Sequence, residues 1–147
     1  MKDGFSGGCL CGAVRYESAA PPFLCAHCHC VDCRKTSGTG HGTHVVVASN
    51  AVTVKGALKA YSRPADSGNI IMRKFCADCG SPVLSINSSV QDMTFIRASS
   101  LDDPEVVKPA MVVYASRAVS WDMVDPSLPS FPMMPEGGPQ KVLADVR

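Results

Sequence analysis

Short hydrophobic stretches alternate with turn signals along most of the chain. The stretch HVVVA at 44–48 is a β-branched run typical of a buried strand, and AVRYE at 13–17 alternates apolar and polar positions. Similar stretches occur at 22–26, 52–55, 58–61, 70–75, 83–86, 93–98 and 111–115. Segments such as DSGN and INSSVQD separate them, and no segment keeps a helical period over about eleven residues. The pattern predicts an all-β domain of short strands.

The composition changes from Asp125 onward. The stretch DPSLPSFPMMPEGGP holds five of the eleven prolines, and proline cannot pair within a central strand. We therefore predict an extended tail that either lies over the domain or stays mobile. We place the domain at residues 1–131 and a Pro- and Gly-rich C-terminal tail at 132–147.

The size and charge of the chain exclude several classes of function. A length of 147 residues suits one domain with its own core. A net charge of +1 and 6% aromatic residues argue against a nucleic-acid-binding module, which needs a basic, aromatic-rich face. No apolar run reaches the roughly 18 residues that span a bilayer, and the first residues lack the apolar core of a signal peptide. We expect a cytoplasmic protein without a membrane partner, in which clustered cysteines indicate metal rather than disulfides.

Two cysteine pairs with trailing glycines have the form of zinc knuckles. One is the C-x-x-C pair in FCADCGSPV, and the other is the C-x-C pair in CLCG. The glycine after each pair allows the backbone to bend so that amides point at sulfur. A structural zinc site is closed by four ligands, and the long intervening loop costs little to close. The spacing therefore predicts one closed zinc site made by Cys9, Cys11, Cys76 and Cys79.

Three further cysteines lie close together in CHCVDCRKTSG. Three thiolates on a tetrahedral ion leave one position empty, which is the arrangement of a catalytic zinc. The spacing therefore favours an open site made by Cys28, Cys30 and Cys33. A closed site completed by Cys25, His27 or His29 remains an alternative, as does a purely redox role. His41 and His44 lead into a strand and are interpreted as surface or core residues rather than ligands.

Zinc held by three thiolates favours a thiol substrate over water. The ion already carries a formal charge of −1 with its ligands, so it acidifies water poorly, whereas a coordinated thiol loses its proton. A bound thiolate adds a second negative charge, which nearby cations would offset. Arg34 and Lys35 follow the last cysteine and could also bind the carboxylates of an acidic thiol such as glutathione. Two solvated surface charges are an equally simple interpretation.

Taken together, the motifs GGCLCGAVRYE, CHCVDCRKTSG, FCADCGSPV and SLDDP resemble the glutathione-dependent formaldehyde-activating enzyme (GFA) family. The ending DPSLPSF is similar to that family's D-x-L-P-x-F pattern. The resemblance implies a β-tent fold of short antiparallel strands held by zinc knuckles. It also implies two zinc ions, a structural one on Cys9, Cys11, Cys76 and Cys79 and a catalytic one on Cys28, Cys30 and Cys33. The implied function is that of a carbon–sulfur lyase, an S-(hydroxymethyl)glutathione synthase, which joins glutathione or another small thiol to formaldehyde or a similar small aldehyde.

The chain departs from the family pattern at two places, and other functions remain open. Many family members carry a histidine where this chain has Val112, and DPSLPSF is one residue longer than usual. Both changes could reshape the pocket. A scaffold or interaction module with two structural zinc sites is the main alternative, and a fourth protein ligand at the second site would favour it. The oligomeric state is not predicted, and a homodimer is left open.

Overall fold

The computed structural model describes residues 4–138, 141–142 and 144. It contains two β-sheets, a short α-helix after the third strand and four short 3₁₀ segments, and the described residues Gly138, Lys141, Val142 and Ala144 are also helical. The all-β fold that the hydrophobic pattern predicts is thereby confirmed. The strands, in chain order, are β1 (Phe5–Gly8), β2 (Arg15–Ser18), β3 (Leu24–Cys28), β4 (Gly42–Ala48), β5 (Val52–Lys55), β6 (Leu58–Pro64), β7 (Ile70–Cys76), β8 (Pro82–Asn87), β9 (Met93–Arg97) and β10 (Met111–Val113).

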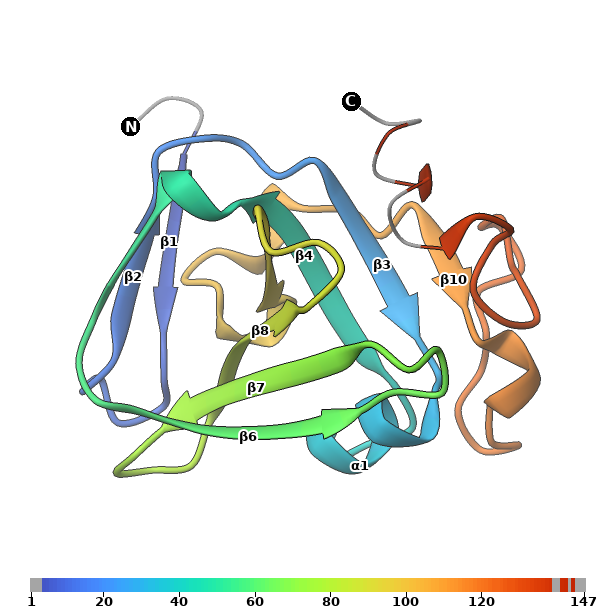
Figure 1. The fold of residues 1–147 in the computed structure, drawn as a ribbon, viewed down its shortest axis with the longest axis horizontal. Helices are drawn as coiled ribbons and strands as arrows, with labels where there is room; N and C mark the ends of the chain where they lie inside the picture. The colour runs from blue at the N-terminus through green and yellow to red at the C-terminus, as the bar shows by residue number, and fades with distance from the viewer. Residues whose placement is uncertain (1–3, 139–140, 143, 145–147) are drawn as a thin grey trace.

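The larger sheet has seven strands in the order β10-β3-β4-β9-β8-β7-β6. Its neighbouring strands are antiparallel, except that β10 pairs with β3 in parallel. The sheet bends strongly, so that β6 and β7 run across the steeper β3 and β4 (Figure 1). This curvature gives the sheet a concave face.

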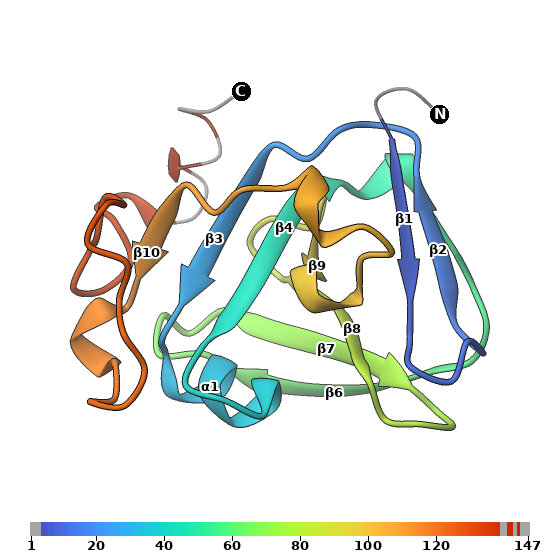
Figure 2. The same cartoon turned by 180° about the vertical axis from the view of Figure 1, so that it is seen from behind.

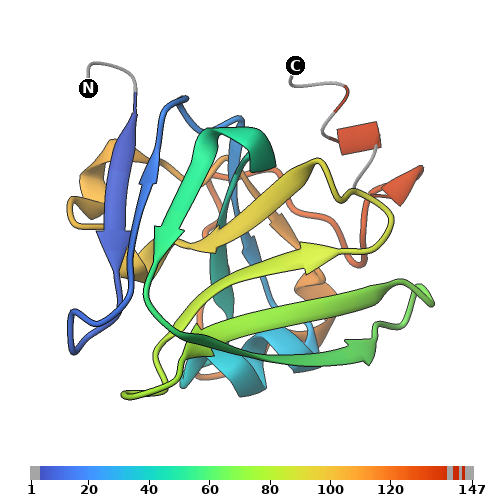
Figure 3. The same ribbon diagram turned by 60° about the vertical axis from the view of Figure 1, so that its left-hand side comes forward.

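The smaller sheet has three strands in the order β1-β2-β5. Figure 3 shows these strands side by side at one end of the molecule, in blue and green. Residues of both sheets form the main core, including Val14 and Tyr16 from the smaller sheet side and Val45, Val47 and Ile96 from the larger. The Tyr16 hydroxyl shares a hydrogen bond of 2.6 Å with the Ser100 hydroxyl. Burial of these apolar side chains holds the two sheets together.

β4 illustrates how the sequence forms a central strand. Its residues Val45, Val46 and Val47 are all buried, at 0–2% exposure, although consecutive side chains point to opposite faces. Both faces of this strand are therefore covered. β-branched side chains favour the extended backbone and pack well on such a strand.

The α-helix that carries two of the three clustered cysteine positions at its start is α1 (Val31–Ser37). It begins directly after Cys30, whose side chain accepts a hydrogen bond from the amide of Cys33, and it ends at Gly38 in the left-handed conformation. With seven residues the helix is too short to show a hydrophobic period, which explains why the sequence pattern does not predict it. Strand β1, in the glycine-rich FSGG, is the other element that the pattern misses.

Part of the Pro-rich segment lies beside β10 at the edge of the larger sheet (Figure 2). The amide of Val112 donates to the carbonyl of Pro129, and the amide of Phe131 donates to the carbonyl of Val112. The amide of Tyr114 donates to the carbonyl of Met133. These bonds cover the outer edge of β10, which would otherwise expose unpaired backbone groups. The predicted boundary at residue 131 stays a prediction, and several residues of the predicted tail lie outside the described part of the chain.

Candidate metal and thiol site

The two predicted cysteine groups are each brought together by the fold. One ligand atom from each of Cys9, Cys11, Cys76 and Cys79 lies within 4.8 Å of the others, and the same holds for Cys28, Cys30 and Cys33. No disulfide joins the eight cysteines. Both groups could therefore hold a metal ion.

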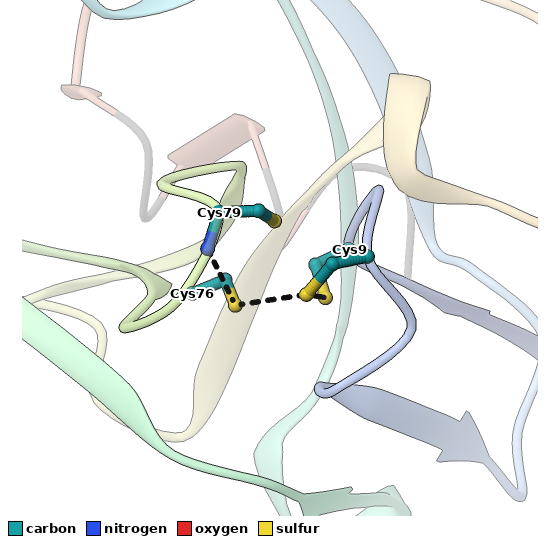
Figure 4. Close-up of side chains that lie close together, drawn as sticks. Cys9, Cys76 and Cys79 are labelled. Atoms are coloured by element: carbon teal, nitrogen blue, oxygen red, sulfur yellow. Dashed lines mark hydrogen bonds between the residues drawn. The ribbon is translucent and has the colours of Figure 1, made fainter.

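The four-cysteine group lies where the loop after β1 faces the turn between β7 and β8 (Figure 4). The Sγ atoms of Cys9 and Cys11 are 3.6 Å apart, and those of Cys11 and Cys76 are 3.8 Å apart. Zn–S bonds of about 2.3 Å in a tetrahedron place neighbouring sulfurs about 3.8 Å apart. The donor set and its spacing fit zinc.

Backbone amides point at the sulfurs, as the trailing glycines predict. The amides of Asp78 and Cys79 donate to the Cys76 Sγ at 3.3 and 3.4 Å, and the amide of Val14 donates to the Cys9 Sγ at 3.2 Å. Gly12 and Gly80 have positive φ values of 83° and 76°. Hydrogen bonds from Ser81 lower the pKa of Cys79 to about 5, which favours the thiolate that binds metal.

The three-cysteine group lies between the end of β3 and the start of α1. Cys28 is the last residue of β3, Cys30 caps the helix and Cys33 lies in its first turn. The amide of Cys33 donates to the Cys30 Sγ at 3.2 Å. Hydrogen bonds from Cys28 and Cys33 hold the pKa of Cys30 well below its ordinary value. The end of β3 and the start of α1 thus bring three sulfurs together, and the lowered pKa of Cys30 favours its thiolate form.

The residues considered as a fourth ligand lie outside this group. Cys25 is buried in the main core, where burial raises the pKa of its thiol to about 11. The Nδ1 of His27 lies 2.8 Å from the Thr43 hydroxyl, and His29 belongs to a different group with His41 and Asp122. Among the described residues, none of these three completes the three-cysteine group.

His44 contacts the three-cysteine group without joining it. Its Nε2 lies 3.4 Å from the Cys33 Sγ. Burial lowers the pKa of His44 to about 3, so its imidazole is neutral at physiological pH. The sequence-based interpretation of His44 as a core residue gave no indication of this contact.

A cavity of about 560 Å³ opens on the concave face of the larger sheet, and the three cysteines form part of its wall. Apolar residues such as Leu24, Phe95 and Met111 line another part of it. None of the residues of the four-cysteine group lines this cavity. The two groups therefore differ in their surroundings: the three-cysteine group lines this cavity, whereas the four-cysteine group lies outside it with Cys11 and Cys79 exposed at the surface.

Three arginines also line the cavity: Arg63, Arg73 and Arg117. Arg63 lies 3.8 Å from Asp32, and Arg117 lies 3.5 Å from Asp66. Arg73 forms no ion pair with any described residue, and its charge lowers the pKa of Cys30 as a minor contributor. Arg73 is thus the cation in the wall that is open to an acidic ligand.

The predicted contacts Arg34 and Lys35 lie on α1 after Cys33 and are not among the described residues that line the cavity. Sequence reasoning singled them out because they follow the last cysteine in the chain. It missed Arg73, whose only signal is a charge within the apolar run IIMRKF. Strand alternation turns that side chain toward the concave face.

A buried arginine also lies behind the three cysteines. Arg97, at the end of β9, is 7% exposed, and its Nη2 donates to the Thr36 hydroxyl at 2.6 Å. Burial lowers the pKa of Arg97, and the Cys33 thiol opposes this effect. Arg97 forms no salt bridge with a carboxylate in the described residues. A buried cation needs a counter-charge, and the cysteine group is the negative partner that its surroundings offer.

Val112, at the position where many GFA family members carry a histidine, is fully buried in β10. It is not among the residues that line the cavity, whereas its neighbours Met111 and Val113 are. The next residue, Tyr114, lines the cavity too and has a positive φ of 56°, the only non-glycine residue of the described chain to do so. Strained backbone of this kind clusters at functional sites.

An all-β fold that gathers seven of its eight cysteines into one four-sulfur and one three-sulfur group defines a protein with two candidate metal sites, one of them in the wall of a cavity. A family model described as glutathione-dependent formaldehyde-activating enzyme matches residues 4–117. The chain belongs to this family, as the cysteine motifs predict.

A solved structure supports the fold. The chain is similar to the crystal structure of a Rhodobacter sphaeroides protein, a structural genomics target, with a TM-score of 0.55 and 18% sequence identity. The similarity covers 86% of this chain and 98% of that one. No curated protein gives a significant match. No helix in the described part of the chain is long and apolar enough to cross a bilayer.

Proposed function

We propose that the protein is a carbon–sulfur lyase that joins glutathione to formaldehyde or a similar small aldehyde, with the reverse cleavage also available. The observation that carries this proposal is the position of Cys28, Cys30 and Cys33 in the wall of the cavity. Family membership supports glutathione and formaldehyde as the substrates. The cytosol, which keeps thiols reduced, would keep these cysteines available for metal.

We assign a structural zinc to the four-cysteine group and a catalytic zinc to the three-cysteine group. Zinc at Cys28, Cys30 and Cys33 would take a thiol as a further ligand and favour its deprotonation. The cavity supports the division, because the three-cysteine group forms part of the wall of a space that can hold a substrate thiol, whereas the four-cysteine group already has the four ligands that close a zinc site. Arg34 and Lys35 remain proposed substrate contacts from the sequence, and Arg73 is a competing assignment.

The side chains around the cavity suit this chemistry in three ways. Buried Arg97 offsets the negative charge that accumulates when a thiolate joins three others. Arg73 can pair with a carboxylate of glutathione at the cavity wall. The apolar part of the wall excludes water from the reacting atoms.

The reaction needs one nucleophile and one proton donor. The glutathione sulfur donates an electron pair to the carbonyl carbon of the aldehyde, the π pair of the C=O bond moves to oxygen, and the oxygen takes up a proton. We assign the hydrogen bond to that oxygen to Tyr114, because it lines the cavity and packs against the cluster of Cys28, Cys33 and Val113. Burial raises the pKa of Tyr114, so its hydroxyl keeps its proton at neutral pH.

Binding and turnover measured on the zinc-loaded protein test this proposal. Glutathione should bind in a calorimetric titration, and the exchange between ¹³C-formaldehyde and its glutathione adduct, followed by NMR, should exceed the uncatalysed rate. Cys30→Ser should abolish both effects, because it removes one of the three sulfurs proposed to hold the catalytic zinc, while serine can still cap α1. Tyr114→Phe should retain glutathione binding while slowing exchange by roughly tenfold to a hundredfold. Absence of glutathione binding to the zinc-loaded wild type at millimolar concentration would favour the scaffold alternative.

A further inference from the structure

A second group of metal-ligating side chains lies outside the cavity. One ligand atom from each of His29, His41 and Asp122 lies within 4.8 Å of the others. Cys28 pairs with Gly42 across β3 and β4, so His29 and His41 are the next residues beyond that pair on the two strands. Cys28 lines the cavity, and strand alternation turns His29 toward the opposite face of the sheet.

The Nδ1 atom of His29 is a buried polar atom that lacks a hydrogen-bond partner among the described residues. The residue is 1% exposed, and this atom lies 3.6 Å from the Asp122 Oδ2. An unpaired buried nitrogen costs free energy, and native structures leave few of them. The atom points at a carboxylate but is too far away for a good hydrogen bond, which leaves room for an ion between them.

The side chains of His41 and Asp122 are held in place by a hydrogen bond and remain partly exposed to solvent. His41 Nδ1 donates to Asp122 Oδ2 at 2.6 Å, and the two side chains are 24% and 16% exposed. A Cβ atom at Gly40 would lie 2.3 Å from Asp122 Oδ2. The absence of a side chain at Gly40 therefore allows the loop that carries Asp122 to approach the strand ends.

The distances suit a small divalent ion. Metal–nitrogen and metal–oxygen bonds of about 2.0–2.1 Å in a tetrahedron separate ligand atoms by about 3.3 Å. The observed separations of 3.6 and 2.6 Å from Asp122 Oδ2 lie on either side of that value, and all three ligand atoms lie within 4.8 Å of one another, so modest shifts of these side chains would accommodate the ion. Two imidazoles and one carboxylate favour zinc, cobalt or nickel over magnesium and calcium.

We propose that His29, His41 and Asp122 form a third metal site, separate from both cysteine groups, for a divalent transition-metal ion. The ion ties the loop that carries Asp122 to the ends of β3 and β4, on the face of the sheet away from the cavity. Three protein ligands leave a further coordination position for water. This site does not depend on the activity proposed above.

Cobalt titration of the zinc-loaded protein tests the proposal. Two equivalents of zinc per chain are added first and free zinc is removed, so that the thiolate-rich cysteine groups take the zinc and the proposed third site stays available to added Co²⁺. Trp121 is the single tryptophan of the chain and directly precedes Asp122, so paramagnetic Co²⁺ at this site should quench its fluorescence. We expect one cobalt per chain, with visible d–d absorption and without the intense near-ultraviolet bands of cobalt–thiolate bonds.

Asp122→Asn and His41→Gln should each weaken cobalt binding at least tenfold. His27→Gln is the matched control, because its ring lies 4.9 Å from the His41 ring and yet is outside the ligand group, so its binding should equal that of the wild type. Absence of a cobalt equivalent in the wild type would overturn the proposal, as would cobalt–thiolate bands or unchanged binding in both ligand variants. The wild-type titration decides the question even where a variant fails to fold.

Discussion

At the scale of single residues, two assignments of the substrate-binding cation compete, and they differ in whether the cation lines the cavity. Arg34 and Lys35 follow the cysteines in the sequence, whereas Arg73 is far from them in sequence and lines the cavity with them. Arg34 lies on α1 and is not among the described residues that line the cavity, whereas Arg73 lies on β7 and lines the cavity. The two assignments give different predictions for the same experiment.

We expect Arg73→Ala to raise the Kd for glutathione about fivefold to tenfold, which corresponds to about 1–1.5 kcal/mol for a partly exposed charged contact. The matched variant Arg34→Ala should change the Kd by less than about twofold. Calorimetric titration of the zinc-loaded variants measures both values. The reverse order, with Arg34→Ala the more damaging change, would restore the assignment made from the sequence.

Arg97 shows why some site residues could not be predicted. It ends the apolar run MTFI, and the sequence alone does not reveal whether such a charge faces solvent or the interior. Its position is decided by the pairing of β9 with β4, which sets Arg97 opposite His44. The cysteines, in contrast, could be predicted because ligand pairs within a turn are local in sequence.

At the scale of secondary-structure elements, the four-cysteine group joins two turns that belong to different sheets. The loop after β1 belongs to the smaller sheet, and the turn between β7 and β8 belongs to the larger. A metal ion coordinated by these four sulfurs would link the two sheets. This arrangement suits a structural role, because the group makes no part of the cavity wall.

Cys79→Ser should therefore unfold the domain or lower its Tm by tens of degrees. A structural zinc contributes on the order of 10 kcal/mol, which is comparable to the entire stability of a domain. Cys25→Ser is the matched control, since it changes a buried thiol outside both groups and should cost about 1–2 kcal/mol. Circular dichroism melts of the zinc-loaded proteins give the comparison. A Cys79→Ser protein that melts with the wild type would refute the structural assignment.

At the scale of the whole molecule, contact between the two sheets depends on the buried Tyr16. Its side chain lies in the main core, and a Cβ atom at Gly7 would lie 2.2 Å from its hydroxyl oxygen. Burial raises the pKa of Tyr16 to about 12, with the hydrogen bond to Ser100 opposing the shift. The folded state therefore favours the neutral phenol.

This shift gives a pH dependence with a defined sign. The folded-state pKa exceeds the unfolded value of about 10, so the contribution of Tyr16 is complete below pH 10 and is lost as the pH rises to about 12. Two pKa units correspond to about 2–3 kcal/mol. Tyr16→Phe lacks this titration, so the stability difference between wild type and variant should shrink by about that amount across this interval. Denaturant midpoints at several pH values measure it, and parallel curves for the two proteins would contradict the prediction.

The sequence by itself determined the elements and the candidate metal ligands whose signals are local. β-branched runs such as 44–48 predicted strands, and the spacing of Cys76 and Cys79 with Gly80 predicted a metal-binding turn. Local signals suffice here because side-chain alternation and turn geometry depend on a few consecutive residues. The family could be identified for the same reason, since its motifs are short and their order is fixed.

Only the tertiary structure decided which residues surround the cysteines and which face the cavity. The bend of the larger sheet places Arg73 in the wall with Cys28, and the pairing of β10 with β3 places Tyr114 there, although both are separated from Cys28 by tens of residues. Strand register likewise placed His41 beside His29, and the loop that follows β10 brings Asp122 to them from a distant part of the chain. Such contacts depend on long-range pairing and sheet curvature, which no local pattern of hydrophobic and polar residues encodes.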